Sequence, residues 1–213
     1  MKEYDPAEKK SRRASDARRM VALAADLASV ATVFVALCML RFQREAFLYF
    51  TTDSNILAAL ACLLAAIFRI RALRRPGAAI PLSVRVLHFA GTVAVTVTFL
   101  TVLVFLGPAY GFGGMYAGAN LPLHLFVPLL CLLSTLCGDD TALPRPSLSL
   151  YGAIPVVLYG TVYAALVLPG RMPDLYGFNA GGRWYITMPA FFIGAVLLSL
   201  GVFWLSVLSR KKR

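Results

Sequence analysis

Six uninterrupted apolar stretches divide this chain. They cover residues 20–40, 46–68, 86–106, 121–137, 148–168 and 184–208. A helix needs about 20 residues to cross about 30 Å of hydrocarbon, and each of these segments must be helical because lipid offers no partner to a free backbone N–H or C=O. Alternating strands of about ten residues, which are typical of membrane barrels, are absent from the sequence. The pattern predicts an all-α polytopic membrane protein with six transmembrane helices.

The composition supports this prediction. Hydrophobic residues make up 59% of the 213 residues and charged residues 15%, whereas soluble domains average about 45–50% and about 25%. This balance excludes a disordered chain and argues against a cytosolic enzyme. The four cysteines lie in or beside apolar stretches, without CxxC spacing or a histidine at metal-ligand spacing. We therefore predict no metal site and no cofactor.

The basic residues predict the topology. The segments 1–19, 69–85, 138–147 and 209–213 hold 17 of the 21 Lys and Arg residues, and the alternate loops hold four. By the positive-inside rule both termini are cytoplasmic, in a plasma or inner membrane. The chain then has a basic cytoplasmic segment (1–19), a membrane domain (20–208) and a basic tail (209–213). With a net charge of +11, these tails are expected to contact anionic lipid headgroups rather than nucleic acid. The sequence does not indicate the oligomeric state.

The densest polar group within a span lies near the start of the second stretch. Thr51, Ser54 and Asn55 follow the i, i+3, i+4 spacing of one helix face, and Asp53 points away from it. Polar groups in hydrocarbon are costly and often mark function. In the alternative, purely structural interpretation, the hydroxyls bond to their own helix and Asn55 bonds to a neighbouring helix.

A second polar group begins the fourth stretch. Asn120 and His124 are four residues apart, and Pro128 follows four residues later. Since proline has no N–H, we expect a kink that leaves the carbonyl of His124 free. Counted at 1.5 Å per residue, Thr51 and His124 each lie about 5–7 Å below the outer membrane surface. They can meet if the two spans are neighbours.

A hydroxyl beside an imidazole is the minimal nucleophile–base pair. We therefore predict Thr51 as nucleophile and His124 as general base, acting on a long-chain ester that arrives from the lipid. Asn55, Asn120 and Ser54 are candidates to bind substrate or stabilise an oxyanion. Asp53 is a candidate, by spacing alone, to bind substrate or orient the imidazole. We expect the ionisable Asp26 and His88, which lie within other spans, to be structural.

These residues carry a resemblance. The run Phe50-Thr51-Thr52-Asp53-Ser54-Asn55, the later Asn120, His124 and Pro128, and the outward Leu175-Tyr176-Gly177-Phe178 resemble the androgen-induced family of integral-membrane threonine hydrolases and its bacterial relatives. The resemblance implies a six-helix fold and hydrolysis of fatty acid esters of hydroxy fatty acids by Thr51 and His124. It departs at Gly177, where the family usually has proline.

Two other functions remain open. The same polar group suits a non-enzymatic protein that binds or transports a lipid or small solute, although the spans show neither a repeat nor ionisable residues along a full path. The chain also fits a structural membrane subunit. Aromatic residues in the outward loops are most simply an interfacial belt.

Overall fold

The computed structural model describes residues 6–75 and 78–211. Its α-helices are α1 (Pro6–Met39), α2 (Phe50–Arg74), α3 (Leu82–Thr101), α4 (Gly107–Tyr110), α5 (Phe112–Met115), α6 (Val127–Cys137), α7 (Ile154–Val167) and α8 (Trp184–Lys211). Three short 3-10 helices lie between them, at η1 (Arg44–Leu48), η4 (Asp139–Thr141) and η5 (Pro146–Ala153). Two segments are π-helical, at η2 (Val102–Leu106) and η3 (Pro122–Phe126). Helices make up 82% of the chain, and the described residues contain no strand, so the all-α prediction is confirmed.

Five of the helical segments are long and apolar enough to cross a membrane. They are Ala14–Met39, Phe50–Arg74, Leu82–Tyr110, Pro146–Val167 and Trp184–Lys211. Their outward faces carry bare apolar side chains, such as Phe34 and Phe105, each more than 60% exposed, which is the surface that lipid covers. The remaining predicted stretch forms the shorter apolar helix Pro122–Cys137.

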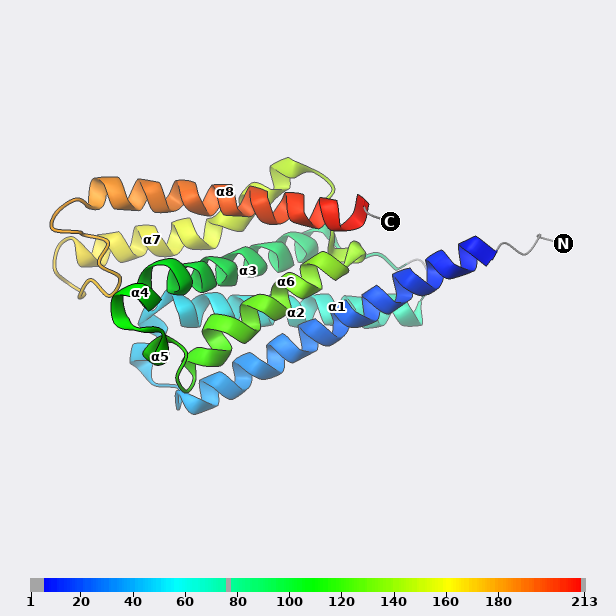
Figure 1. Cartoon of the computed structure of the whole chain (residues 1–213), viewed down its shortest axis with the longest axis horizontal. Coiled ribbons are helices and arrows are strands. Elements are labelled where there is room, and N and C mark those ends of the chain that lie inside the picture. Colours follow the sequence, from blue (N-terminus) through cyan, green and yellow to red (C-terminus); the bar gives the residue numbers. More distant parts are fainter. Residues whose placement is uncertain (1–5, 76–77, 212–213) are drawn as a thin grey trace.

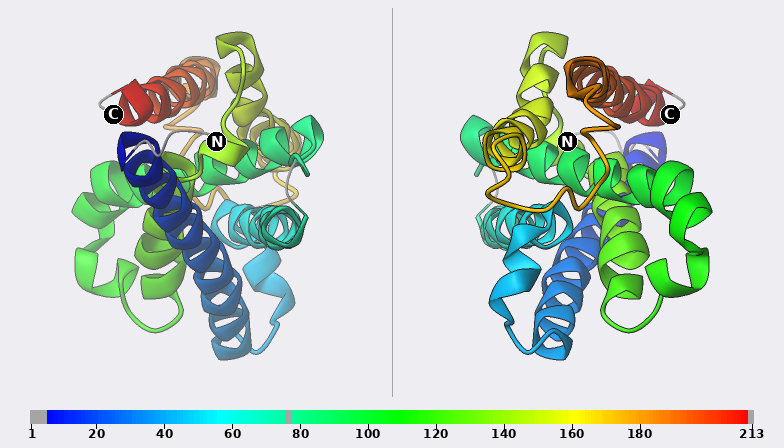
Figure 2. Two further views of the ribbon diagram at one scale, coloured as in Figure 1. Left: turned by 90° about the vertical axis from the view of Figure 1, so that its right-hand side faces the viewer. Right: turned by 90° about the vertical axis from the view of Figure 1, so that its left-hand side faces the viewer.

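Helix α3 is the centre of the bundle (Figure 1). It packs against α2 and α6 on one side and against η5, α7 and α8 on the other, an arrangement that Figure 2 shows from both ends. Gly91 makes the α2 contact possible, because a Cβ there would lie only 2.9 Å from the Cα of Ala58. Small residues at such crossings let membrane helices approach closely.

A buried ionic cluster joins four of the helices. Asp26 of α1 is fully buried, forms an ion pair with Arg69 of α2, and lies 3.0 Å from Nε2 of His88 on α3. Ser134 of α6 donates to Asp26 over 2.6 Å. The prediction that Asp26 and His88 are structural agrees with these contacts. Cys62 lies close enough to Asp26 and His88 for the three side chains to hold a metal ion. The charge of Asp26 is, however, already balanced by Arg69.

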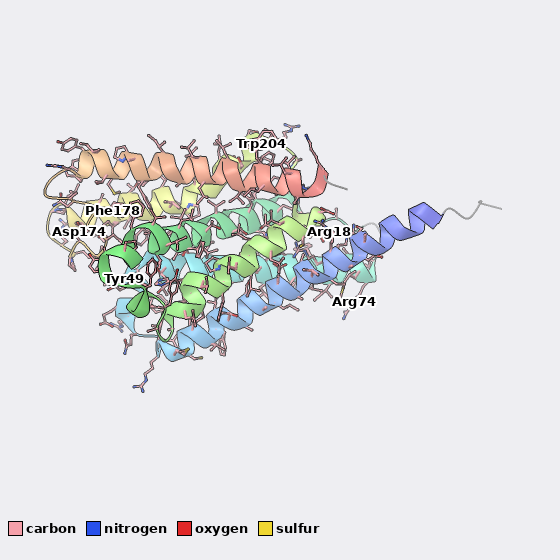
Figure 3. The ribbon with its side chains drawn as sticks, viewed as in Figure 1. Arg18, Tyr49, Arg74, Asp174, Phe178 and Trp204 are labelled. Carbon is pink, nitrogen blue, oxygen red and sulfur yellow. The ribbon has the colours of Figure 1, made fainter. Side chains whose placement is uncertain are left out.

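The two ends of the bundle differ. Helix α1 begins and α8 ends at one end, and α4, α5 and the loop at residues 169–183 lie at the other (Figure 1). Arg18 and Arg74 mark the first end and Asp174 and Phe178 the second (Figure 3). Of the predicted basic segments, the first five residues and residues 212–213 lie outside the described part of the chain, as do the side chains up to residue 13.

Candidate functional site

Thr51 is presented by the first turn of α2. The chain turns through η1, passes Tyr49 in an extended conformation (φ −99°, ψ 131°) and enters the helix at Phe50. In this turn the amides of Thr52 and Asp53 bond to the carbonyl of Tyr49. The half-buried Thr51 hydroxyl therefore stands at the positive end of a helix dipole.

His124 lies in a π-helical turn that Pro128 helps to explain. The amide of Val127 bonds to the carbonyl of Pro122, five residues earlier, so the next bond of this pattern would need an N–H from Pro128. The carbonyl of Leu123 thereby loses its backbone partner. The prediction for the carbonyl of His124 stays a prediction. The carbonyl of Leu123 accepts a hydrogen bond from outside its helix, from Asn55, over 3.2 Å.

Thr51 and His124 meet. The Thr51 Oγ1 atom lies 3.4 Å from Nε2 of His124, whose side chain is 6% exposed. On the other side of the ring, Nδ1 lies 2.6 Å from the carbonyl oxygen of Met115. A carbonyl can only accept, so Nδ1 carries the hydrogen and Nε2 presents its lone pair to the hydroxyl. The imidazole is thus held in the tautomer that a general base requires.

Asn55 joins the two elements of the pair. Its Nδ2 donates to the carbonyl of Thr51 over 2.7 Å and to that of Leu123 over 3.2 Å. Both amide hydrogens are therefore engaged, and Asn55 is not a free donor for an oxyanion as the sequence suggested. It instead fixes the start of α2 against the turn that carries His124.

Ser54 and Asn120 are hydrogen-bonded to neighbouring groups, and Asp53 lies away from the pair. The hydroxyl of Ser54 is committed to the carbonyl of Thr51 and to Thr98. Asn120 donates to the carbonyl of Gly114 over 3.2 Å, which holds the loop that presents Met115 rather than an oxyanion. Asp53 is exposed. Among the described residues no hydrogen bond or ion pair joins it to His124, because it lies on the opposite face of α2 from Thr51.

The loop at residues 169–183 covers the start of α2. The hydroxyl of Tyr176 accepts a 2.8 Å hydrogen bond from the amide of Phe50, next to Thr51. Asp174 fixes this loop by accepting from the Tyr163 hydroxyl over 2.6 Å and from the amides of Phe178 and Asn179. Desolvation acts to raise the pKa of the Asp174 carboxyl, but these hydrogen bonds outweigh it and hold the pKa below its ordinary value.

A small apolar cavity of about 30 Å³ lies beside Thr51. Its wall includes Thr51 and the tyrosines at positions 159, 163 and 176. A larger groove of about 560 Å³ runs between α3–η2 and α8 and shares Tyr176, Phe178 and Phe191 with the cavity. Both are lined almost entirely by apolar and aromatic side chains, which is the environment that an acyl chain requires.

The sequence reasoning missed two parts of this site. The carbonyl of Met115 cannot be found from its side chain, although three glycines around it indicated a tightly turned loop. Tyr176 fits the interfacial aromatic belt by its residue type, and the one signal in the sequence that it belongs to the site is its position in the Leu175–Phe178 run.

Comparison with family models, curated proteins and solved structures found no match to this chain.

Proposed function

We propose that this protein is an intramembrane hydrolase that cleaves a long-chain lipid ester, with Thr51 as nucleophile and His124 as general base. The observation that supports it most is the pairing of the Thr51 hydroxyl with Nε2 of His124, while Nδ1 is fixed by the carbonyl of Met115. The 3.4 Å separation is slightly longer than a working hydrogen bond, as is common before substrate binds.

In the first half-reaction, Oγ1 of Thr51 attacks the ester carbonyl carbon while Nε2 of His124 takes the hydroxyl proton. The carbonyl oxygen becomes an oxyanion. When this intermediate collapses, the bond to the alcohol oxygen breaks, the alcohol leaves with the proton from His124, and Thr51 carries the acyl group. In the second half, water attacks the acyl carbon, His124 takes a proton from the water, and Thr51 leaves with that proton as the fatty acid is released.

The surroundings favour a lipid substrate. The cavity beside Thr51 continues into a groove along α3 and α8, helices that are apolar enough to cross a membrane. A chain lying in the bilayer could enter sideways without passing through water. Burial of apolar surface, worth about 25 cal/mol per Å², would contribute to its binding.

The finer topology belongs to the same proposal. We take Pro122–Cys137 as the sixth span, since α1 begins and α8 ends at the same end of the bundle and this requires an even number of crossings. Both termini are then cytoplasmic, in a plasma or inner membrane. Thr51 and His124 lie toward the outer surface, and the basic tails face anionic headgroups.

The resemblance to the androgen-induced hydrolases is also a proposal. One backbone feature separates the two patterns: Gly177 has a φ of +69°, which a proline ring forbids. The loop that carries Tyr176 therefore follows a different path from one built on Tyr-Pro-Phe. Differences in substrate between this chain and that family are expected at this loop.

The test is ester turnover by the purified protein in detergent, with a fatty acid ester of a hydroxy fatty acid as substrate. Thr51→Val and His124→Ala should each lower turnover by at least about 10³-fold, since either change removes the nucleophile–base pair. Thr52→Val is the matched control, because it makes the same change one residue away and should keep turnover. Full activity in the Thr51 and His124 variants would overturn the assignment.

The groove favours one other function. Its volume of about 560 Å³ suits a protein that binds or carries a lipid without cleaving it. In that case the parent protein would bind a fluorescent fatty acid and show no ester turnover, and Thr51→Val would leave binding unchanged.

A further inference from the structure

We propose that the hydroxyl of Tyr176 is a third catalytic group, which donates a hydrogen bond to the oxyanion formed when Thr51 attacks. This inference rests on the proposed function. It is carried by the position of Tyr176, which lines the cavity together with Thr51 and whose hydroxyl is bonded to the amide of Phe50, the residue immediately before the nucleophile.

The three tyrosines of the cavity differ in what their hydroxyl hydrogens do. Tyr159 donates to the carbonyl of Leu48 over 2.6 Å, and Tyr163 donates to Asp174 over 2.6 Å. Tyr176 accepts from Phe50, so its own hydrogen remains to be donated. In the absence of substrate, Tyr176 donates this hydrogen to the hydroxyl oxygen of Tyr159. That oxygen is neutral, so a negatively charged oxyanion is the stronger acceptor and replaces it. Tyr176 is thus the tyrosine of the cavity whose hydrogen a substrate can claim.

The chemistry of a phenol suits this role. An oxyanion is stabilised by donors that are already oriented and shielded from water, so that little reorganisation accompanies the reaction. Burial raises the pKa of Tyr176 above its ordinary value, so its proton stays in place at any pH the enzyme meets. The bond accepted from Phe50 polarises the hydroxyl and strengthens it as a donor.

The structure also holds Tyr176 rigidly. The amide of Tyr176 donates to the Tyr163 hydroxyl over 3.1 Å, and that hydroxyl donates in turn to Asp174. The ring packs against Tyr163 at 5.4 Å and against Tyr159 and Tyr49 at 6.4 Å between ring centres. Because its backbone and its ring are both already fixed, this donor loses little conformational entropy when it binds a charged oxygen.

The test compares Tyr176→Phe with Tyr49→Phe. Tyr49 contacts the Tyr176 ring but does not line the cavity, so its variant removes a phenol hydroxyl beside the site without removing the proposed donor. Each purified protein is assayed for kcat and KM on the long-chain ester. Each is also assayed for inhibition by an alkyl trifluoromethyl ketone, which forms a charged tetrahedral adduct with a nucleophilic hydroxyl.

Tyr176→Phe should lower kcat and weaken inhibition by about 10²-fold each, with KM changed less than threefold and with the Tyr49→Phe values near those of the parent. A rise in KM alone would mean that Tyr176 only shapes the cavity, and this would overturn the inference. Unchanged kcat would do the same. A parent protein without any turnover would instead refute the proposed function, so the two failures are distinguishable.

Discussion

Asn55 should be the residue that holds the reactive pair together, and removing its amide tests this directly. In Asn55→Ala the carbonyl of Thr51 keeps its bond from Ser54, at 3.1 Å. The carbonyl of Leu123, a residue only 2% exposed, loses the bond from Asn55 that replaces its missing helical partner. A lost hydrogen bond costs about 1 kcal/mol and a buried unsatisfied carbonyl about 1–3 kcal/mol, so the free energy of unfolding should fall by about 2–4 kcal/mol.

The free energy of unfolding can be measured by titrating the protein from neutral detergent micelles with sodium dodecyl sulfate, following tryptophan fluorescence. Ester turnover is measured on the same samples. We expect kcat to fall by at least about tenfold, because the start of α2 and the turn of His124 lose the side chain that joins them. Asn179→Ala, which removes a side-chain amide from the loop at residues 169–183, is the control. Parent-like stability and turnover in Asn55→Ala would refute this account of the site.

Three further predictions follow from the packing and the loop. Arg69→Ala should lower the free energy of unfolding by about 3–5 kcal/mol in the same titration, because it leaves the fully buried Asp26 without its cation; a loss below about 1 kcal/mol would contradict the buried pair. Gly91→Val should cost about 1–3 kcal/mol, since even a Cβ would lie 2.9 Å from the Cα of Ala58, and a neutral result would mean that α2 and α3 are less closely packed. The lowered pKa of Asp174 means that its hold on the loop is full above about pH 3.9, the ordinary value, and is lost as pH falls through the lower folded value. The protection of the Phe178 and Asn179 amides from hydrogen exchange, relative to an unstructured amide at the same pH, should therefore fall in acid in the parent and be low at all pH values in Asp174→Asn; equal protection profiles would contradict it.

The fold could be predicted from the sequence because lipid leaves few alternatives. Long apolar stretches must be helical, and the i, i+3, i+4 spacing of Thr51, Ser54 and Asn55 was enough to put them on one face. Depth counted along two helices correctly suggested that Thr51 and His124 could meet. Pro128 likewise indicated a disturbed helix, although the exact carbonyl involved depends on a π-turn that spacing alone does not specify.

The partners of these residues were harder to predict. Asn55, Ser54 and Asn120 are all good donors by type. Backbone carbonyls, whose positions only the packed structure defines, accept from both hydrogens of the Asn55 amide, from the Ser54 hydroxyl and from one hydrogen of the Asn120 amide. The group that orients His124 is a backbone carbonyl, at Met115, and any residue type could have supplied it. The hydroxyl of Tyr176 reaches Phe50 across 126 positions of sequence, which no local pattern encodes.

The central claim is that the hydroxyl of Thr51 forms a covalent bond with the acyl group. The most direct measurement is mass spectrometry of the protein after reaction with a long-chain alkyl fluorophosphonate, which modifies activated hydroxyl nucleophiles. The account predicts one adduct, on Thr51, that disappears in His124→Ala and persists in Thr52→Val. An adduct on another residue, or ester turnover by a protein that the reagent does not modify, would contradict it.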